Sequence, residues 1–128
     1  MKKALVVDDS RAIRTIVRRI LVAEGFDVAE ACDGREAVKA LQGSAASFDL
    51  LCTDYNMPEM NGIDLLRRVR RMPQCKALPA LMITTETHVQ SMENAYNAGA
   101  NEYLMKPFTA DMMRDKLRML GLLQAVAL

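Results

Sequence analysis

The stretch FDLLCTD, residues 48–54, indicates the fold class of this chain. Its centre, Leu50 to Cys52, is apolar at consecutive positions, which is typical of a parallel strand with helices against both faces of its sheet. The chain breaks soon afterwards at Pro58 and at the pair Asn61-Gly62, and a helical pattern then begins. The sequence around this stretch therefore predicts a buried central strand that ends in a carboxylate, Asp54.

The same alternation of short apolar runs and helical periods extends in both directions. Strands are expected at residues 4–7, 27–31, 48–53, 78–83 and 103–105. Helices are expected around residues 11–24, 37–42, 63–70 and 88–98 and from about residue 110. Strands that alternate with helices predict βαβ units with right-handed crossovers, and so an α/β fold with a doubly wound, five-stranded parallel sheet.

Composition narrows the possible functions. The chain has 128 residues, of which 51% are hydrophobic and 26% are charged, as expected for one globular domain at residues 1–128 without an output domain. A net charge of +1 gives no field that would attract nucleic acid or an anionic membrane. No apolar run approaches the ~18 residues of a membrane-spanning helix, so membrane insertion is not expected. A cytoplasmic location is expected.

Polar side chains follow most of the expected strands, at the point where each strand ends. They are Asp8, Asp9, Asp54, Thr84, Thr85 and Lys106. Because parallel strands end at the same edge of a sheet, and ligands of such sheets bind there, we expect these residues to form one site. Taken singly, each residue is better explained as a helix cap or turn residue, and it is their combination at one edge that indicates a site.

The residue types at this edge suggest phosphoryl chemistry. Carboxylates packed together repel one another, and a bound cation relieves this repulsion. Mg²⁺ is the cation that best suits an all-oxygen set of ligands. Zinc is disfavoured, because His88 is the only histidine and no cysteine is expected at this edge. Asp54 is the candidate nucleophile for an acyl phosphate, with the Lys106 ammonium and the Thr84 hydroxyl as groups that contact phosphoryl oxygens.

Four motifs follow one another along the chain: Asp8-Asp9, DYNMPEMNG (54–62, beginning with Asp54), ALMIT (80–84) and KPF (106–108). In these motifs the chain resembles CheY-like receiver domains of response regulators, particularly the stand-alone chemotaxis type. The resemblance covers essentially the whole chain. It implies a flavodoxin-like strand order, 2-1-3-4-5, and a place in two-component signalling.

For the site, the resemblance implies that Asp54 accepts a phosphoryl group from the phosphohistidine of a histidine kinase. It implies Mg²⁺ bound by Asp9, Asp54 and the backbone carbonyl of Asn56, with Asp8 acting mainly through water. Lys106 would contact Asp54 and then its phosphate. The protein would catalyse only its own phosphorylation and dephosphorylation, and would not be an enzyme with a separate substrate.

The resemblance also implies a switch. Thr84 would move toward the phosphate and Tyr103 would swing inward, which changes the surface of the fourth helix, fifth strand and last helix, where a downstream protein would bind. On its pattern alone, Tyr103 is equally compatible with a surface position. Asn56 and Glu86 would flank the path of attacking water and tune the lifetime of the phosphate.

Several alternatives stay open at this point. A phosphorelay intermediate would pass phosphate to another histidine, a flavodoxin-like electron carrier would share the fold, and a magnesium-dependent phosphatase would share the nucleophile. Arginines cluster on the first and third expected helices, where solvated faces are favoured over nucleic-acid binding: Arg11, Arg14, Arg18, Arg19, Arg67, Arg68, Arg70 and Arg71. For the first-helix cluster, which lies close in sequence to Asp8-Asp9, kinase docking is also open. The apolar C-terminus, residues 120–128, would fray, dock on its own domain or form a homodimer.

Overall fold

Strands and helices alternate through the described residues, 1–43 and 47–124, of this computed structural model. The strands are β1 (Lys3–Val7), β2 (Asp27–Ala31), β3 (Leu50–Thr53), β4 (Ala80–Thr84) and β5 (Glu102–Met105). The helices are α1 (Arg11–Ala23), α2 (Gly34–Gln42), α3 (Gly62–Arg71), the short 3-10 helix η1 (Pro73–Cys75), α4 (Val89–Ala98) and α5 (Ala110–Met119). The strands are parallel in the order β2-β1-β3-β4-β5, which confirms the expected fold class.

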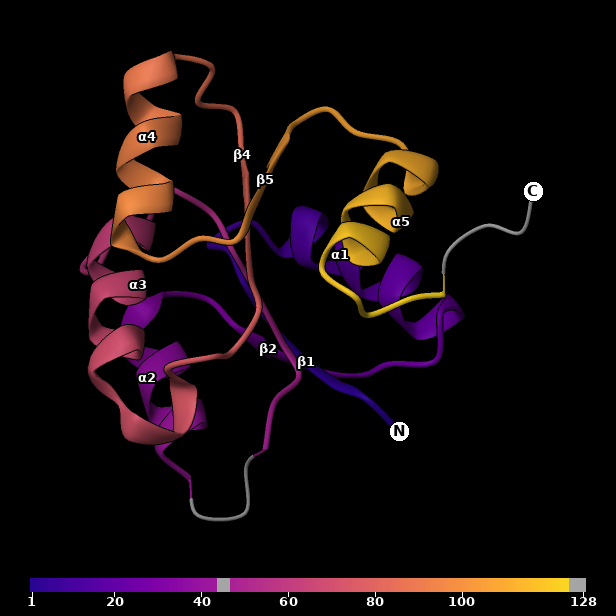
Figure 1. Cartoon of the computed structure of the whole chain (residues 1–128), viewed down its shortest axis with the longest axis horizontal. Helices are drawn as coiled ribbons and strands as arrows, with labels where there is room; N and C mark the ends of the chain where they lie inside the picture. Colours follow the sequence, from indigo (N-terminus) through magenta and orange to yellow (C-terminus); the bar gives the residue numbers. More distant parts are fainter. Residues whose placement is uncertain (44–46, 125–128) are drawn as a thin grey trace.

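Helices cover both faces of the sheet, as the apolar central strand predicted. In Figure 1, α1 and α5 lie on one side of the sheet, and α2, α3 and α4 lie on the other. Leu50 and Cys52 pack into the core beneath α1 and α5, whereas Leu51 packs into the core beneath the other three helices. Each fully buried leucine contributes about 1.5–3 kcal/mol to folding, so β3 is anchored from both sides.

Side-chain caps fix where most helices begin. Ser10 accepts a hydrogen bond from the Ile13 amide at the start of α1, and Asn61 accepts one from the Asp64 amide at the start of α3. The first helix ends two residues before Gly25, whose φ of 90° lies in the left-handed region. Helix α4 differs, because His88 occupies its N-cap position without a side-chain cap hydrogen bond.

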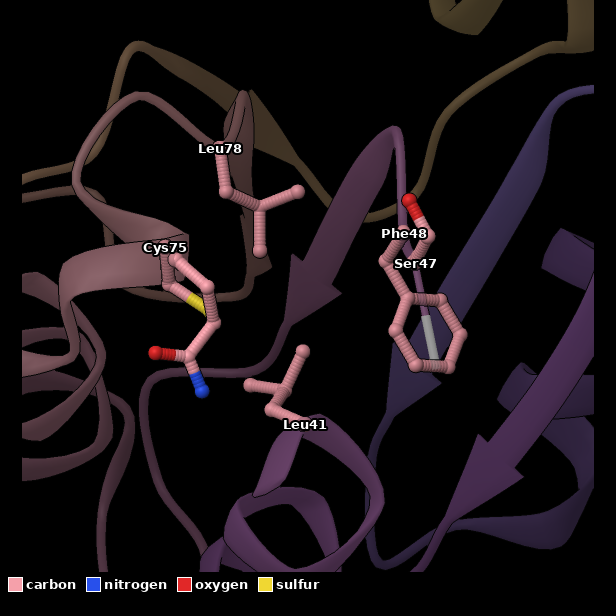
Figure 2. A pocket seen from close by; sticks show the side chains of 6 residues that line it. Leu41, Ser47, Phe48, Cys75 and Leu78 are labelled. Carbon is pink, nitrogen blue, oxygen red and sulfur yellow. The ribbon is translucent and has the colours of Figure 1, made fainter. Parts of the chain in front are cut away.

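Strands β3 and β4 begin two residues later than the apolar runs suggested. Phe48 precedes the ladder, where its ring lies 4.8 Å from the Lys3 ammonium, and the Leu78 amide bonds to the Cys75 carbonyl in a turn. Both side chains line a small cavity with Leu41 and Cys75, near the amino-terminal ends of β3 and β4 (Figure 2). The cavity is therefore remote from the edge that carries the candidate site residues.

The described part of the apolar C-terminus packs on its own chain. Leu122 is buried, and Leu120 and Leu123 contact the core beneath α1 and α5. Residues 125–128, which complete the predicted apolar tail, lie outside the described residues, and the expected homodimer stays a prediction. Across residues 1–43 and 47–124, every helix is too short or too polar to cross a bilayer.

Candidate functional site

The register of the sheet brings the predicted edge residues together. Val7 pairs with Thr53 and Thr84 pairs with Met105, so Asp8, Asp54 and Lys106 each come one residue after a paired position. The backbone bonds continue past the strand ends, from the Asp8 amide to Ala31 O, from the Asp54 amide to Val7 O and from the Lys106 amide to Thr84 O. These backbone hydrogen bonds alone therefore bring the three side chains to the same edge of the sheet.

One ammonium is shared between two carboxylates. Lys106 Nζ lies 2.8 Å from Asp8 Oδ2 and 3.5 Å from Asp54 Oδ2. The side chains are 12%, 3% and 12% exposed for Lys106, Asp8 and Asp54, so water screens these contacts weakly. Asp8 is therefore the closer partner of Lys106, whereas the sequence predicted a contact of Lys106 only with Asp54.

Asp54 has the electrostatics of a reactive carboxylate. Burial raises the pKa of Asp54 above its usual value, the Lys106 cation opposes that rise, and the Asp8 carboxylate adds to it. Asp54 Oδ1 accepts a hydrogen bond of 2.7 Å from the Tyr55 amide, which favours the charged form. The carboxylate is therefore held in place but is poorly stabilised as an anion.

The acidic residues form a cluster of the kind that binds a hard cation. One carboxylate oxygen from each of Asp8, Asp9 and Asp54 lies within 4.8 Å of the others. Asp9 is exposed and lines an open hollow together with Asn56. An all-oxygen donor set with one open side fits Mg²⁺, which binds few protein ligands and keeps several waters.

One expectation about this edge is wrong. Cys32 directly follows β2, so a cysteine does lie at the carboxyl-terminal edge of the sheet. Its thiol donates a 2.8 Å hydrogen bond to Glu36 Oε2 and belongs to a separate cluster with Asp33. Cys32 directly follows the strand that the sequence predicts at residues 27–31, so the sequence itself indicated a cysteine at this edge.

The predicted switch and rate-tuning residues form a hydrogen-bonded chain beside Asp54. The Glu86 amide donates to Thr84 Oγ1 at 3.3 Å, and the Tyr103 hydroxyl donates to Glu86 O at 2.8 Å. Asn56 Nδ2 donates to Glu86 Oε1 at 2.7 Å. Tyr103 is only 4% exposed, and burial and the nearby Glu86 carboxylate raise its pKa to about 12. Thr85 is exposed.

Two contacts at the site were not foreseen. The amide of Gly62 donates to Tyr55 O at 2.8 Å, and Gly62 packs so closely that an added Cβ would meet the Asp54 carbonyl oxygen. Arg14 Nη1 donates to Asp8 O at 2.7 Å, and Arg14 Nε pairs with Glu30. The sequence marks Gly62 only as part of a turn signal, and nothing in it links Arg14 to a backbone carbonyl.

The arginines of α3 do not all lie on a solvated face. Arg67, Arg68 and Arg71 are exposed, as expected, whereas Arg70 is half-buried and bonds to backbone carbonyls of other segments. For Arg70, the predicted solvated position is wrong, because the apolar periodicity of a helix does not reveal where loops return to cover it.

Comparison with known proteins identifies the class of this chain. Residues 4–118 match the response regulator receiver domain family, and the chain therefore belongs to that family. It is 45% identical over 116 residues to the chemotaxis protein CheY of Pseudomonas aeruginosa, covering 90% of this chain and 92% of that protein. It is 44% identical to the chemotaxis protein CheY-3 of Vibrio cholerae, covering 90% and 88% of the two chains.

Solved structures agree with the sequence matches. The chemotaxis response regulator CheY4 of Vibrio cholerae superposes with a TM-score of 0.87 at 39% identity, covering 94% of this chain and 98% of that chain. The response regulator TrrA of Thermotoga maritima, solved in complex with Mg²⁺ and BeF, gives a TM-score of 0.81 at 31% identity, covering 94% and 99%. The chain is therefore a two-component response regulator, a signalling phospho-switch.

Proposed function

We propose that Asp54 is the phosphoryl acceptor of this response regulator, and that a histidine kinase is the donor. The observation that supports this most directly is the position of Asp54, half-buried beside the Lys106 ammonium and clustered with two further carboxylates. Such a carboxylate is a poorly stabilised anion, and its attack on a phosphoryl group forms an acyl phosphate, a mixed anhydride whose negative charge lies on the phosphoryl oxygens.

In the proposed reaction, an Asp54 carboxylate oxygen attacks the phosphorus of a phosphohistidine. The new O–P bond forms as the N–P bond breaks, and the electron pair of that bond stays on the imidazole nitrogen. Lys106 and the Thr84 hydroxyl then contact the transferred oxygens. Asp9, Asp54 and the Asn56 carbonyl would hold Mg²⁺, with Asp8 acting mainly through water, and the ion neutralises charge on the phosphoryl oxygens when bound.

We propose that Thr84 and Tyr103 convert phosphorylation into a change of surface. Rotation of the Thr84 hydroxyl toward a phosphoryl oxygen would weaken its bond with the Glu86 amide, and Glu86 also holds the Tyr103 hydroxyl. Tyr103 is buried with its hydroxyl on Glu86 O, so a movement of the Glu86 segment on phosphorylation would be transmitted to Tyr103.

The downstream partner would bind the surface of α4, β5 and α5. This surface carries large apolar side chains that are exposed: Val89 (69%), Tyr96 (42%), Met105 (40%) and Met112 (43%). Large exposed apolar side chains on these elements are the kind of groups that a partner protein would cover. A change at Tyr103, which lies in β5, would reach this surface directly.

Loss of the phosphate would be controlled by Asn56 and Glu86. Their hydrogen bond joins the loop after β3 to the loop after β4, beside Asp54. Dephosphorylation measured for Asn56→Ala and Glu86→Ala should differ from the wild type in at least one variant. Unchanged lifetimes in both would contradict a rate-tuning role.

The acceptor is tested by incubation with acetyl phosphate and Mg²⁺, followed by intact-mass measurement. The wild type should gain one phosphoryl group, and Asp54→Asn should gain none. Asp49→Asn, which alters a carboxylate at the other end of β3, is the matched control and should be modified like the wild type. Modification of Asp54→Asn at the wild-type rate would refute the assignment.

A further inference from the structure

Arg70, near the end of α3, donates hydrogen bonds with every N–H of its guanidinium. Nε and Nη2 bond to Gly99 O at 3.2 and 2.7 Å, and Nη2 also bonds to Asn101 Oδ1 at 3.0 Å. Nη1 bonds to Cys75 O at 2.8 Å and to Lys76 O at 3.3 Å. A guanidinium has five N–H groups, so its donor capacity is fully used.

These bonds tie together segments that are distant in sequence. Gly99 is the C-cap residue of α4, and Asn101 leads into β5. Asn101 Oδ1 also accepts a 2.8 Å bond from the Ala80 amide, and the Asn101 amide donates to Ala80 O at 2.8 Å. One cation thus joins α3 to the carboxyl-terminal end of α4 and, through Asn101, to the start of β4.

The aliphatic part of Arg70 packs as closely as its polar end. A Cβ at Gly99 would lie 2.7 Å from Arg70 Cγ, and the φ of Gly99 is 123°, where side chains are rarely accepted. Gly99 therefore allows both the helix end and the close approach of the arginine stem. A lysine at position 70 would keep the charge, but would lack the planar fork that reaches several carbonyls at once.

The two ends of α4 are held very differently. At its amino-terminal end, His88 makes no side-chain cap bond and Val89 is 69% exposed. That end begins three residues after Glu86, whose carbonyl accepts a hydrogen bond from the Tyr103 hydroxyl. Its other end is closed by the backbone bonds of Gly99 and by the guanidinium of Arg70.

We propose that Arg70 is a positioning residue that makes the carboxyl-terminal end of α4 a fixed pivot. A signal that arises at Thr84 and Tyr103 then displaces the amino-terminal end of α4, while residues 99–101 stay in place. This inference rests on the proposed function, because it concerns how the phosphorylation signal reaches the α4 surface.

The first test needs no phosphorylation. Native-state hydrogen exchange is measured for Arg70→Gln and for Arg71→Gln, a control with the same charge change at an exposed neighbour. In Arg70→Gln, the amides of Gly99, Asn101 and Ala80 should exchange at least about tenfold faster relative to the β1 amides, because bonds to a charged donor are lost. In Arg71→Gln they should not.

The second test asks whether the pivot limits the signal. Backbone amide shifts are recorded with Mg²⁺ and beryllofluoride, the ligand class seen with TrrA. In the wild type and Arg71→Gln, the shifts should include residues 84–90 and spare residues 99–101, whereas in Arg70→Gln they should extend into 99–101. If Arg70→Gln does not fold, Arg70→Lys is used and should show the same changes at smaller amplitude.

An identical set of shifted amides in the wild type and the Arg70 variant would overturn the pivot. So would a uniform rise in exchange across the sheet, which would mark Arg70 as a source of general stability only. A wild type that shows no shift with beryllofluoride would instead count against the proposed function, and the exchange experiment would still decide the role of Arg70.

Discussion

Substitution of Gly62 by alanine tests how the backbone around Asp54 is packed. Gly62 is the first residue of α3, and its amide bonds to Tyr55 O. An added Cβ would meet the Asp54 carbonyl oxygen and would also lie 3.1 Å from the Tyr55 Cα. The neighbouring atoms are backbone, so no side-chain rotation can remove the clash.

Two effects of opposite sign decide the outcome. Alanine is favoured over glycine within a helix by about 1 kcal/mol, which would stabilise the variant. Carbon and carbonyl oxygen normally approach no closer than about 3.3 Å, so the chain must shift, and overpacking of this kind costs about 3 kcal/mol. The net expectation is a loss of about 2 kcal/mol of unfolding free energy, since the steric cost exceeds the gain in propensity.

Gly34→Ala is the matched control, because Gly34 is also the first residue of a helix after an acidic or amide N-cap. Its added Cβ would lie 2.8 Å from Met60 Cβ and Cγ and 2.9 Å from Met60 Sδ, so Met60 must shift as a whole, but no backbone carbonyl is met. Urea denaturation should therefore show a smaller loss for Gly34→Ala than for Gly62→Ala, because the clash at position 34 is with one side chain and the clash at position 62 is with backbone atoms. Gly62→Ala with wild-type or higher stability would refute the packing argument.

Three further perturbations address the charges and the switch. In EDTA, Asp54→Asn should be more stable than the wild type at neutral pH, because burial raises the pKa of Asp54. The unfolding free energy of the wild type falls as pH rises through that raised pKa, so the difference between the two proteins should shrink as pH falls below it. A difference in urea midpoint that does not vary with pH would contradict this. Lys106→Met leaves Asp8 and Asp54 without their cation and should cost about 3 kcal/mol, and a loss below about 1 kcal/mol would show that water screens the pair. Tyr103→Phe removes the bond to Glu86 O and should cost about 1 kcal/mol while leaving the rate of phosphorylation by acetyl phosphate unchanged. A slower rate would place Tyr103 in the acceptor chemistry.

Much of the architecture could be predicted, because apolar periodicity indicates the strands and helices, and the residues after the strands indicate the edge of the sheet where the site lies. The run at Leu50–Cys52 indicated a two-faced parallel strand, and the polar residues after the strands indicated the edge where Asp8, Asp54 and Lys106 meet. What could not be predicted depends on distances between segments. The preference of Lys106 for Asp8 is one such case.

The bonding of Arg70 shows the same limit. Its position on α3 follows from periodicity, but its acceptors are carbonyls of loops that return from elsewhere in the chain. Backbone carbonyls are present at every residue, so no sequence signal distinguishes these acceptors from others. Cys32 is a different case, because it directly follows the strand expected at residues 27–31 and its place at the edge could have been predicted from the sequence.

The balance of charge at the site predicts how the proposed Mg²⁺ site should respond to substitution. Asp8, Asp9 and Asp54 carry three negative charges against the single positive charge of Lys106. Asp54→Asn removes a negative charge and a ligand, and should weaken Mg²⁺ binding. Lys106→Met removes a positive charge from a residue that is not a ligand, and should strengthen Mg²⁺ binding. The expected gain is about tenfold if the coupling between Lys106 and the Mg²⁺ site is typical of interacting sites. The exposed carboxylate of Asp64, on α3, provides the control, because Asp64→Asn should change the affinity little. Isothermal titration of the four proteins gives the order, and a Lys106→Met variant that folds but binds Mg²⁺ no more tightly than the wild type would show that repulsion among the carboxylates does not set the affinity.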